Sequence, residues 1–149
     1  CAAMVVRAIA SHSPGSSLAG HVVISTLHTN GAVKTLNRIL EFFPQDQHRS
    51  LLGRLSEILM FVLSQGLIPT GENRVLNYEF LQNTSSAVRS GIAGYGSSSK
   101  ALEDVLKHSG NIEWDRNLGH LLEAGRISHQ SYTMNRMNED ESENMLFTS

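Results

Sequence analysis

The chain has 149 residues, of which 40% are hydrophobic and 17% are charged, and it carries a net charge of −2. This length predicts a single globular unit. The small net charge argues against a nucleic-acid or membrane surface as the partner, so no direct binding to nucleic acid is predicted. Four acidic residues, at positions 139, 140, 141 and 143, make the last segment acidic, because the remainder of the chain has a charge of +2.

Apolar runs such as residues 58–63 fall far short of the roughly 20 residues that span a bilayer. The first apolar stretch lacks the charged start of a signal peptide, so none is expected. The single cysteine, Cys1, excludes an internal disulfide framework and a clustered thiolate zinc site, and it fits a reducing, cytoplasmic setting. Because the first residue is cysteine rather than methionine, we expect sequence upstream of it.

The first two elements are predicted to be a helix and a strand. Residues 2–10 are rich in alanine and predict a short helix. Residues 21–27 form a continuous β-branched and apolar run between Gly20 and the turn at Asn30. Such a run without polar alternation predicts a strand that is buried on both faces, in a parallel sheet covered by helices.

Two helices are predicted next. Thr29 or Asn30 is expected to cap the first, which Pro44 ends. Its apolar stripe consists of Val33, Leu36, Leu40 and Phe43. A longer helix is predicted from about residue 46 to Gly66, because apolar residues recur there at intervals of three and four.

A β-hairpin and a helical region complete the expected structure. The hairpin joins residues 67–69 to residues 74–81 through the turn at 70–73. Thr84 is expected to cap a helix at 85–92, followed by a Gly/Ser loop at 91–99. Further helices are predicted at 101–108, 115–124 and 128–137, with Gly110 and Gly125 at their C-terminal ends. The acidic tail is expected to be disordered.

Several kinds of catalytic site are disfavoured by spacing. Gly91 and Gly96 are separated as in a P-loop, but Ser97 follows them and Lys100 comes three positions late, so the chain has no Walker A motif. Seven histidines occur without an H-E-x-x-H pattern or a Cys/His pair, which disfavours a metal site. No G-x-S-x-G motif supports a serine hydrolase.

One segment places polar residues at both ends of the predicted strand. His21 begins it, Thr26 lies near its end, and His28 and Thr29 follow it. Polar side chains at the carboxyl end of a strand lie where α/β sheets bind ligands, so His28 could contact a phosphate oxygen. The residues alone leave open the alternative that this is simply a capped strand end.

The same segment resembles a known family motif. Residues 20–30, G-H-x4-T-L-H-T-N, are similar to the His box of the secretion ATPase superfamily, which includes the type II secretion, type IV pilus and type IV secretion motors. Later segments resemble the family in the same order, namely residues 32–44, 63–69, 74–81, 87–92 and 118–128. The chain lacks the Cys-x-x-Cys pairs of type II secretion ATPases. That absence favours the pilus-retraction, Dot/Icm and conjugation-type branches.

The resemblance implies a fold and a set of functional residues. The fold class is α/β, the C-terminal part of a RecA-like P-loop NTPase domain followed by a helical subdomain. His28 and His21 would couple the γ-phosphate to subunit movement, with Thr26 and Thr29 near the nucleotide. Family-motif positions are Gly20, Arg38, Gln65 and Arg89. Arg38 could equally be only a surface salt-bridge donor.

The resemblance also implies cofactors, partners and boundaries. ATP and Mg²⁺ would be bound mainly by Walker A, acidic-box and Walker B elements upstream of Cys1. The subunit would form a hexamer and dock on inner-membrane platform proteins of a pilus or secretion machine, at the inner face of the cytoplasmic membrane. The expected divisions are an ATPase core at 1–82, a helical subdomain at 83–137 and a tail at 138–149.

Two functions remain open from the sequence. The first is a motor ATPase, of which these 149 residues alone would be inactive because phosphoryl transfer needs the P-loop lysine and Mg²⁺. The second is a non-enzymatic helical module that binds partners or assembles a ring. The sequence immediately upstream of Cys1 would distinguish them.

Overall fold

The structure is a computed structural model that describes residues 2–9, 20–98, 100–108 and 110–137. It is α/β, as expected. The strands are β1 (Ala2–Ile9), β2 (Gly20–Leu27), β3 (Leu59–Thr70) and β4 (Asn73–Gln82). The helices are α1 (Ala32–Leu40), α2 (His48–Ile58), α3 (Ser86–Gly94), α4 (Lys100–His108), α5 (Trp114–Glu123) and α6 (His129–Asn135). A short 3₁₀ turn, Gln45–Gln47, precedes α2.

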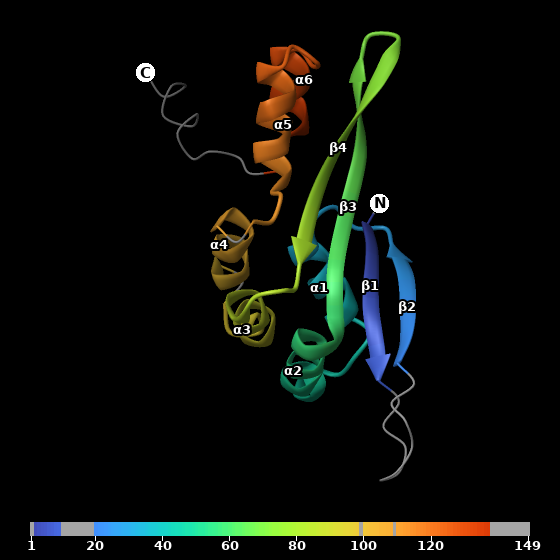
Figure 1. The fold of residues 1–149 in the computed structure, drawn as a ribbon, viewed down its shortest axis with the longest axis vertical. Helices are drawn as coiled ribbons and strands as arrows, with labels where there is room; N and C mark the ends of the chain where they lie inside the picture. Colours follow the sequence, from blue (N-terminus) through green and yellow to red (C-terminus); the bar gives the residue numbers. More distant parts are fainter. Residues whose placement is uncertain (1, 10–19, 99, 109, 138–149) are drawn as a thin grey trace.

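A long antiparallel hairpin organises the molecule. β3 pairs with β4 from Phe61 opposite Gln82 to Thr70 opposite Asn73. Gly71 turns the chain between the strands with a φ of 70°, a left-handed conformation that glycine adopts at little cost. The hairpin predicted from its turn residues is therefore confirmed, and it is longer than expected. β1 and β2 extend the sheet in the order β2-β1-β3-β4, with every pair antiparallel (Figure 1).

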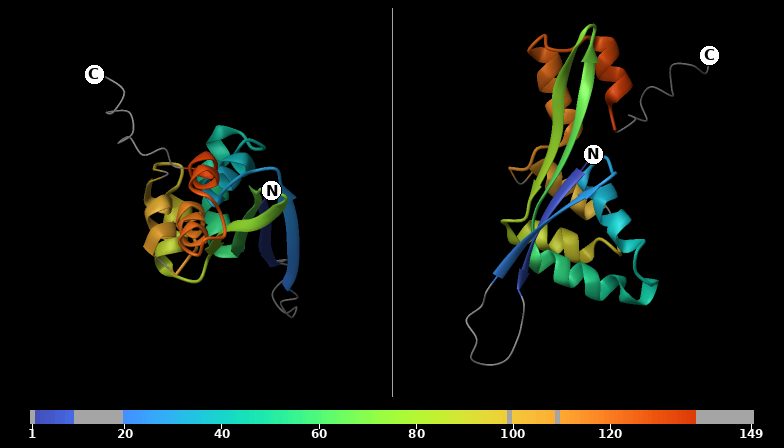
Figure 2. Two further views of the ribbon diagram at one scale, coloured as in Figure 1. Left: turned by 90° about the horizontal axis from the view of Figure 1, so that it is seen from above. Right: turned by 90° about the vertical axis from the view of Figure 1, so that its right-hand side faces the viewer.

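The helices form two groups along the hairpin. α1 to α4 lie around its base, whereas α5 and α6 lie beside its distal half (Figures 1 and 2). Each group has its own apolar cluster. The larger cluster includes Leu36, Leu52, Val62, Leu81, Ile92 and Leu102. The smaller includes Ile68, Trp114, Leu118 and Ile127. The hairpin contributes to both and so connects them.

The prediction of a helix at residues 2–10 is wrong. Residues Ala2–Ile9 form β1, which lies between β2 and β3 in the sheet. Alanine favours a helix, but Val5, Val6 and Ile9 favour a strand, and two neighbouring strands provide pairing for the backbone. Tertiary pairing therefore overrides the weak helix preference.

The strand expected at residues 21–27 is confirmed, but its expected burial is wrong. β2 is the edge strand of an antiparallel sheet and is paired with β1. Val22 and Ile24, two residues apart on one face, are 60% and 71% exposed. A continuous apolar run reports hydrophobicity, and it cannot by itself place the strand at the centre of a parallel sheet.

The prediction that the second helix extends to Gly66 is also wrong. α2 ends at Ile58, and Leu59 begins β3 with an extended backbone. Residues 58–63 are apolar without a break, so their pattern fits a buried helix and a buried strand equally well. Asn83 stabilises the change of structure, because its amide donates to the carbonyl oxygens of Ser56 and Leu59 at 2.8 Å each.

The caps and ends of the helices differ in detail from expectation. α1 has Gly31 at its N-cap, so neither Thr29 nor Asn30 caps it, and Phe43 is exposed rather than part of the buried stripe. Ser85, not Thr84, caps α3 by accepting from the Val88 N–H at 3.2 Å. α3 continues to Gly94, so the first part of the expected 91–99 loop is helical.

The C-terminal helices follow the sequence closely. α4, α5 and α6 lie within one or two residues of the expected starts and ends. Gly110 and Gly125 have φ angles of 71° and 64°, as a helix-terminating glycine requires. The acidic tail lies outside the described residues. In the part of the chain that the structure describes, no helix has both the length and the apolar character needed to cross a membrane.

Candidate functional site

The end of β2 and the start of α1 are joined by a short loop with its own hydrogen bonds. His28 and Asn30 are exposed there, while Thr29 is half-buried. The hydroxyl of Thr29 lies 2.8 Å from that of Thr35, which in turn donates to the Gly31 carbonyl oxygen at 2.8 Å. These bonds fix the loop against the first turn of α1.

Gly31, in this loop, contacts strands β3 and β4 of the sheet. Its N–H donates to the hydroxyl of Ser64 on β3 at 2.7 Å, and its φ is 95°. A Cβ on Gly31 would lie 3.3 Å from Oε1 of Glu79 on β4. Glycine is therefore suited to this position by its left-handed backbone and by the close carboxylate.

The residues expected near the nucleotide do not form one cluster. His28 and Thr26 are exposed at the carboxyl end of β2. His21 and Gly20 begin the same strand, where their backbones pair with Ala8 and Ile9. Seven residues of extended chain separate the two histidines by about 23 Å, so they cannot contact one phosphate together within this chain.

The other expected positions are spread over three elements. Arg38 lies on the exposed side of α1, where it forms an ion pair with Glu41 and its guanidinium carbon lies 5.0 Å from the centre of the Phe42 ring. Gln65 is exposed on β3, opposite Tyr78 in the register. Arg89 is exposed on α3. The structure does not bring these three together with the His-box residues.

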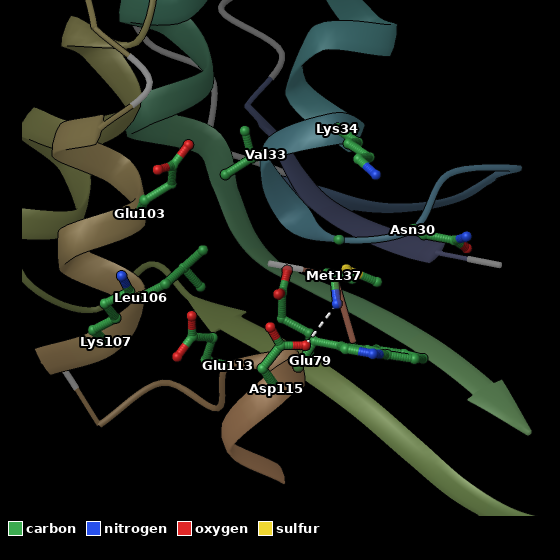
Figure 3. Close-up of a pocket in the computed structure, with 12 residues that line it drawn as sticks. Asn30, Val33, Lys34, Glu79, Glu103, Leu106, Lys107, Glu113, Asp115 and Met137 are labelled. Carbon is green, nitrogen blue, oxygen red and sulfur yellow. Dashed lines mark hydrogen bonds between the residues drawn. The ribbon is translucent and has the colours of Figure 1, made fainter. Parts of the chain in front are cut away.

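A cavity of about 150 Å³ opens beside the loop. Asn30, Val33 and Lys34 come from the loop and α1, and α4 supplies the opposite wall (Figure 3). The other lining residues are Gly31, Glu79, Glu103, Leu106, Lys107, Glu113, Trp114, Asp115 and Met137. The cavity therefore lies between residues 28–31, which we call the His-box loop, and helices α4 and α5, and its lining includes both lysines and carboxylates.

Glu79 is the buried carboxylate of this cavity, with 6% of its surface exposed. It accepts hydrogen bonds from the backbone N–H groups of Ala32 and Trp114. Burial raises the pKa of Glu79 above its ordinary value, and the charges of Glu113 and Asp115 raise it further, while the two N–H bonds oppose the shift. Desolvation is the largest of these effects.

Glu79 was not singled out from the sequence, although a pattern pointed to it. Side chains alternate along β4, and Asn77, Glu79 and Leu81 share the buried face. A carboxylate on the same face as a fully buried leucine needs polar partners inside the protein. The sequence does not show which helices supply them, because those partners are distant along the chain.

Metal binding finds no support in the described residues, which contain no group of three His, Cys, Asp or Glu side chains arranged to hold an ion. Two of the carboxylates that line the cavity accept hydrogen bonds from backbone N–H groups. Asp115 accepts from the Met137 N–H at 2.8 Å (Figure 3), and Glu79 accepts from two helix starts.

Sequence comparison relates the chain to secretion and pilus proteins. The family described as "Type II/IV secretion system protein" matches residues 8–106. The type IV pilus ATPase PilU of Pseudomonas aeruginosa is 32% identical over 126 residues, which are 83% of this chain and 33% of PilU. A twitching motility protein of Neisseria gonorrhoeae is 45% identical over 64 residues, or 42% of this chain and 17% of that protein. The chain thus spans a third or less of these relatives' length.

Structural comparison gives the same result. The pilus retraction motor PilT, solved with bound ADP, superposes with a TM-score of 0.70 and 31% identity, covering 85% of this chain and 36% of PilT. The ATPase DotB of Legionella pneumophila shares the fold at a TM-score of 0.60 and 21% identity, covering 72% of this chain and 29% of DotB. The fold corresponds to part of these ATPases. Because the family match covers most of the chain, this protein belongs to the type II/IV secretion system protein family.

Proposed function

We propose that this chain is the C-terminal portion of a motor ATPase subunit that couples ATP hydrolysis to type IV pilus dynamics, type IV secretion or conjugative transfer. The observation that supports this most is the likeness to PilT and PilU over more than four-fifths of the chain. The division into a core at 1–82, a helical subdomain at 83–137 and a tail at 138–149 is part of the proposal.

In this proposal His28 responds to the γ-phosphate of ATP. Its exposure at the end of β2 leaves the ring accessible, while Thr29 and Gly31 fix the following backbone to α1 and β3. A histidine on a well-bonded loop can transmit the presence or loss of a phosphate to the helix that follows. Thr26 and Thr29 would lie near the same nucleotide, and ATP with Mg²⁺ would be bound mainly by segments outside this chain.

His21 and Arg89 are assigned to contacts outside the His28 site. Because His21 is at the far end of β2, it would act on a different surface, such as that of a neighbouring subunit in a hexamer. Gly20, Gln65 and Arg89 are proposed as family-motif positions that support these contacts. The assembly would dock on membrane platform proteins at the inner face of the cytoplasmic membrane.

The test is ATP hydrolysis by the intact protein that contains this chain. We expect His28→Ala to lower kcat by about tenfold or more, since it removes the phosphate contact. His129→Ala is the matched control, because His129 is an exposed histidine on α6 and its loss should leave hydrolysis unchanged. Equal activity of both variants and the unchanged protein would refute the role of His28.

The 149-residue chain alone is expected to hydrolyse no ATP, because phosphoryl transfer requires a P-loop lysine and Mg²⁺. Hydrolysis by this chain that disappears in His28→Ala would contradict that expectation. An intact protein that neither binds nor hydrolyses ATP would instead favour the non-enzymatic assembly module.

A further inference from the structure

Two helices that are far apart in the sequence begin at the same buried carboxylate. α1 starts at Ala32 and α5 starts at Trp114, and the backbone N–H of each donates to Glu79. Neither helix is capped by the side chain of its own N-cap residue, since Gly31 and Glu113 occupy those positions and neither accepts a side-chain capping hydrogen bond from the helix. One side chain on β4 therefore supplies the cap for both helix starts.

The α1 side of this contact is continuous with the His-box loop. Gly31 precedes Ala32 directly, and its N–H is bonded to Ser64, which is paired with Glu79 in the β3–β4 register. Thr29 is linked to the same turn through Thr35. A displacement of the loop after His28 must therefore move the N–H of Ala32, from which Glu79 accepts a hydrogen bond.

The α5 side is continuous with the C-terminal helices. Asn77, on the same face of β4, donates to the Trp114 carbonyl oxygen at 3.2 Å and accepts from Asn117 at 2.8 Å. The indole N–H of Trp114 donates to the Asn135 carbonyl oxygen at the end of α6, at 2.8 Å. The start of α5 is thus bonded to β4 on one side and to α6 on the other.

We propose that Glu79 is a positioning residue that couples the His-box loop to the C-terminal helices, so that a movement of residues 28–31 is transmitted to α5 and α6. Burial makes the coupling strong, because either helix start that leaves Glu79 loses a hydrogen bond that water cannot easily replace. The coupling itself is a property of the fold. Only its role, which is to pass the nucleotide state to another part of the motor, rests on the proposed function.

The coupling can be measured in the intact protein without nucleotide, by disturbing one end and observing the other. Ser64→Ala removes the acceptor of the Gly31 N–H and should loosen the start of α1. Hydrogen exchange is followed in peptides covering residues 28–36 and 112–120. With Glu79 present, we expect Ser64→Ala to accelerate exchange in both peptides by about threefold or more.

Glu79→Gln is the variant that breaks the link. A glutamine of the same size replaces one carboxylate oxygen by an NH₂ donor and carries no negative charge, so it cannot hold both helix starts as firmly as a carboxylate does. In this background Ser64→Ala should accelerate exchange only in residues 28–36. Glu103→Gln is the matched control, because Glu103 is an exposed glutamate on α4 at the opposite wall of the same cavity. In that background both peptides should still respond.

The proposal is overturned if Ser64→Ala affects residues 28–36 alone while Glu79 is present, or if residues 112–120 respond equally with and without Glu79. If hydrogen exchange in Ser64→Ala equals that of the unchanged protein, Gly31→Ala provides a second disturbance at the start of α1. Its Cβ would lie 3.3 Å from Oε1 of Glu79. No response of residues 112–120 to either change also overturns the proposal.

Hydrolysis separates this inference from the proposed function. Glu79→Gln should lower kcat for ATP while leaving KM within about threefold, since Glu79 contacts helix starts rather than nucleotide. Unchanged kcat in Glu79→Gln would overturn the role of Glu79 in the motor. Absence of ATP hydrolysis in the unchanged protein would overturn the proposed function alone, because the exchange experiment uses no nucleotide.

Discussion

The indole ring of Trp114 lies directly against the backbone of Gly66, so that a Cβ on residue 66 would be 2.6 Å from Cη2 of the ring. Gly66 is on β3 and Trp114 begins α5, and Trp114 belongs to the apolar cluster of the distal hairpin. The contact allows α5 to pack close to the strand. A glycine in the middle of a strand weakens it, and close approach of another group is the usual compensation.

Gly66→Ala should therefore lower the free energy of unfolding by about 1–3 kcal/mol, because the buried ring must move to admit the methyl group. Urea denaturation measures the change. Gly53→Ala is the control, since a Cβ there meets no atom within 4 Å and residue 53 lies inside α2. It should stabilise the protein by about 0.5–1 kcal/mol, the helical advantage of alanine over glycine. An equal loss in both variants would contradict the role of the Trp114 contact.

Ser85 and Thr84 give a second prediction, because they are adjacent hydroxyl residues with different roles. Ser85 accepts from the Val88 N–H at the start of α3, whereas Thr84 is exposed. Ser85→Ala should destabilise the protein by about 1 kcal/mol through loss of the cap. Thr84→Ala should change stability by no more than about 0.5 kcal/mol. Thermal unfolding of the two variants at one pH compares them, and a larger effect of Thr84→Ala would place the cap one residue earlier.

Glu79 should make stability depend on pH in an uncommon direction. Its pKa is raised by burial in the folded protein, so near and above the ordinary value of 4.5 the folded state binds more protons than the unfolded state. The contribution of Glu79 to the free energy of unfolding is therefore highest below pH 4.5. It falls as the pH rises through the pKa that Glu79 has in the folded protein. Most paired carboxylates have a depressed pKa and show the opposite trend.

The prediction is tested by comparing the unchanged protein with Glu79→Gln between about pH 4 and 7. The stability of the unchanged protein relative to the variant should fall as the pH rises, because the glutamine does not titrate. Glu103→Gln serves as the exposed control and should show no such trend. A relative stability that rises with pH would show that the two helix N–H groups outweigh the desolvation of Glu79.

Arg38 should contribute little to stability, even though its sequence position matches the family motif. It is an exposed side chain that pairs with Glu41 and lies over the exposed Phe42 ring. Arg38→Ala should change the free energy of unfolding by less than about 1 kcal/mol. In the intact protein it should alter ATP hydrolysis by no more than about twofold. A loss of hydrolysis without a loss of stability would instead assign Arg38 to the nucleotide site.

Local chemistry along the chain determined several parts of this structure. The turn residues Gly71 and Glu72 specify the hairpin, and Gly110 and Gly125 mark the ends of α4 and α5. The motif at residues 20–30, together with the later segments that follow it in the same order, indicated the family to which the chain belongs. These features could be predicted because each depends on residues that are neighbours in the sequence.

Only the tertiary structure decided the conformation of residues 2–9 and 59–63, because their apolar and alanine-rich patterns suit a helix or a strand until a neighbouring strand pairs with them. The same is true of Glu79. The alternation along β4 puts Glu79 on the same face as Asn77 and Leu81, but its two partners, the N–H groups of Ala32 and Trp114, come from segments on either side of it in the sequence. Hydrogen bonds over such separations form only when packing brings the helix starts to one point, and no local pattern records that meeting.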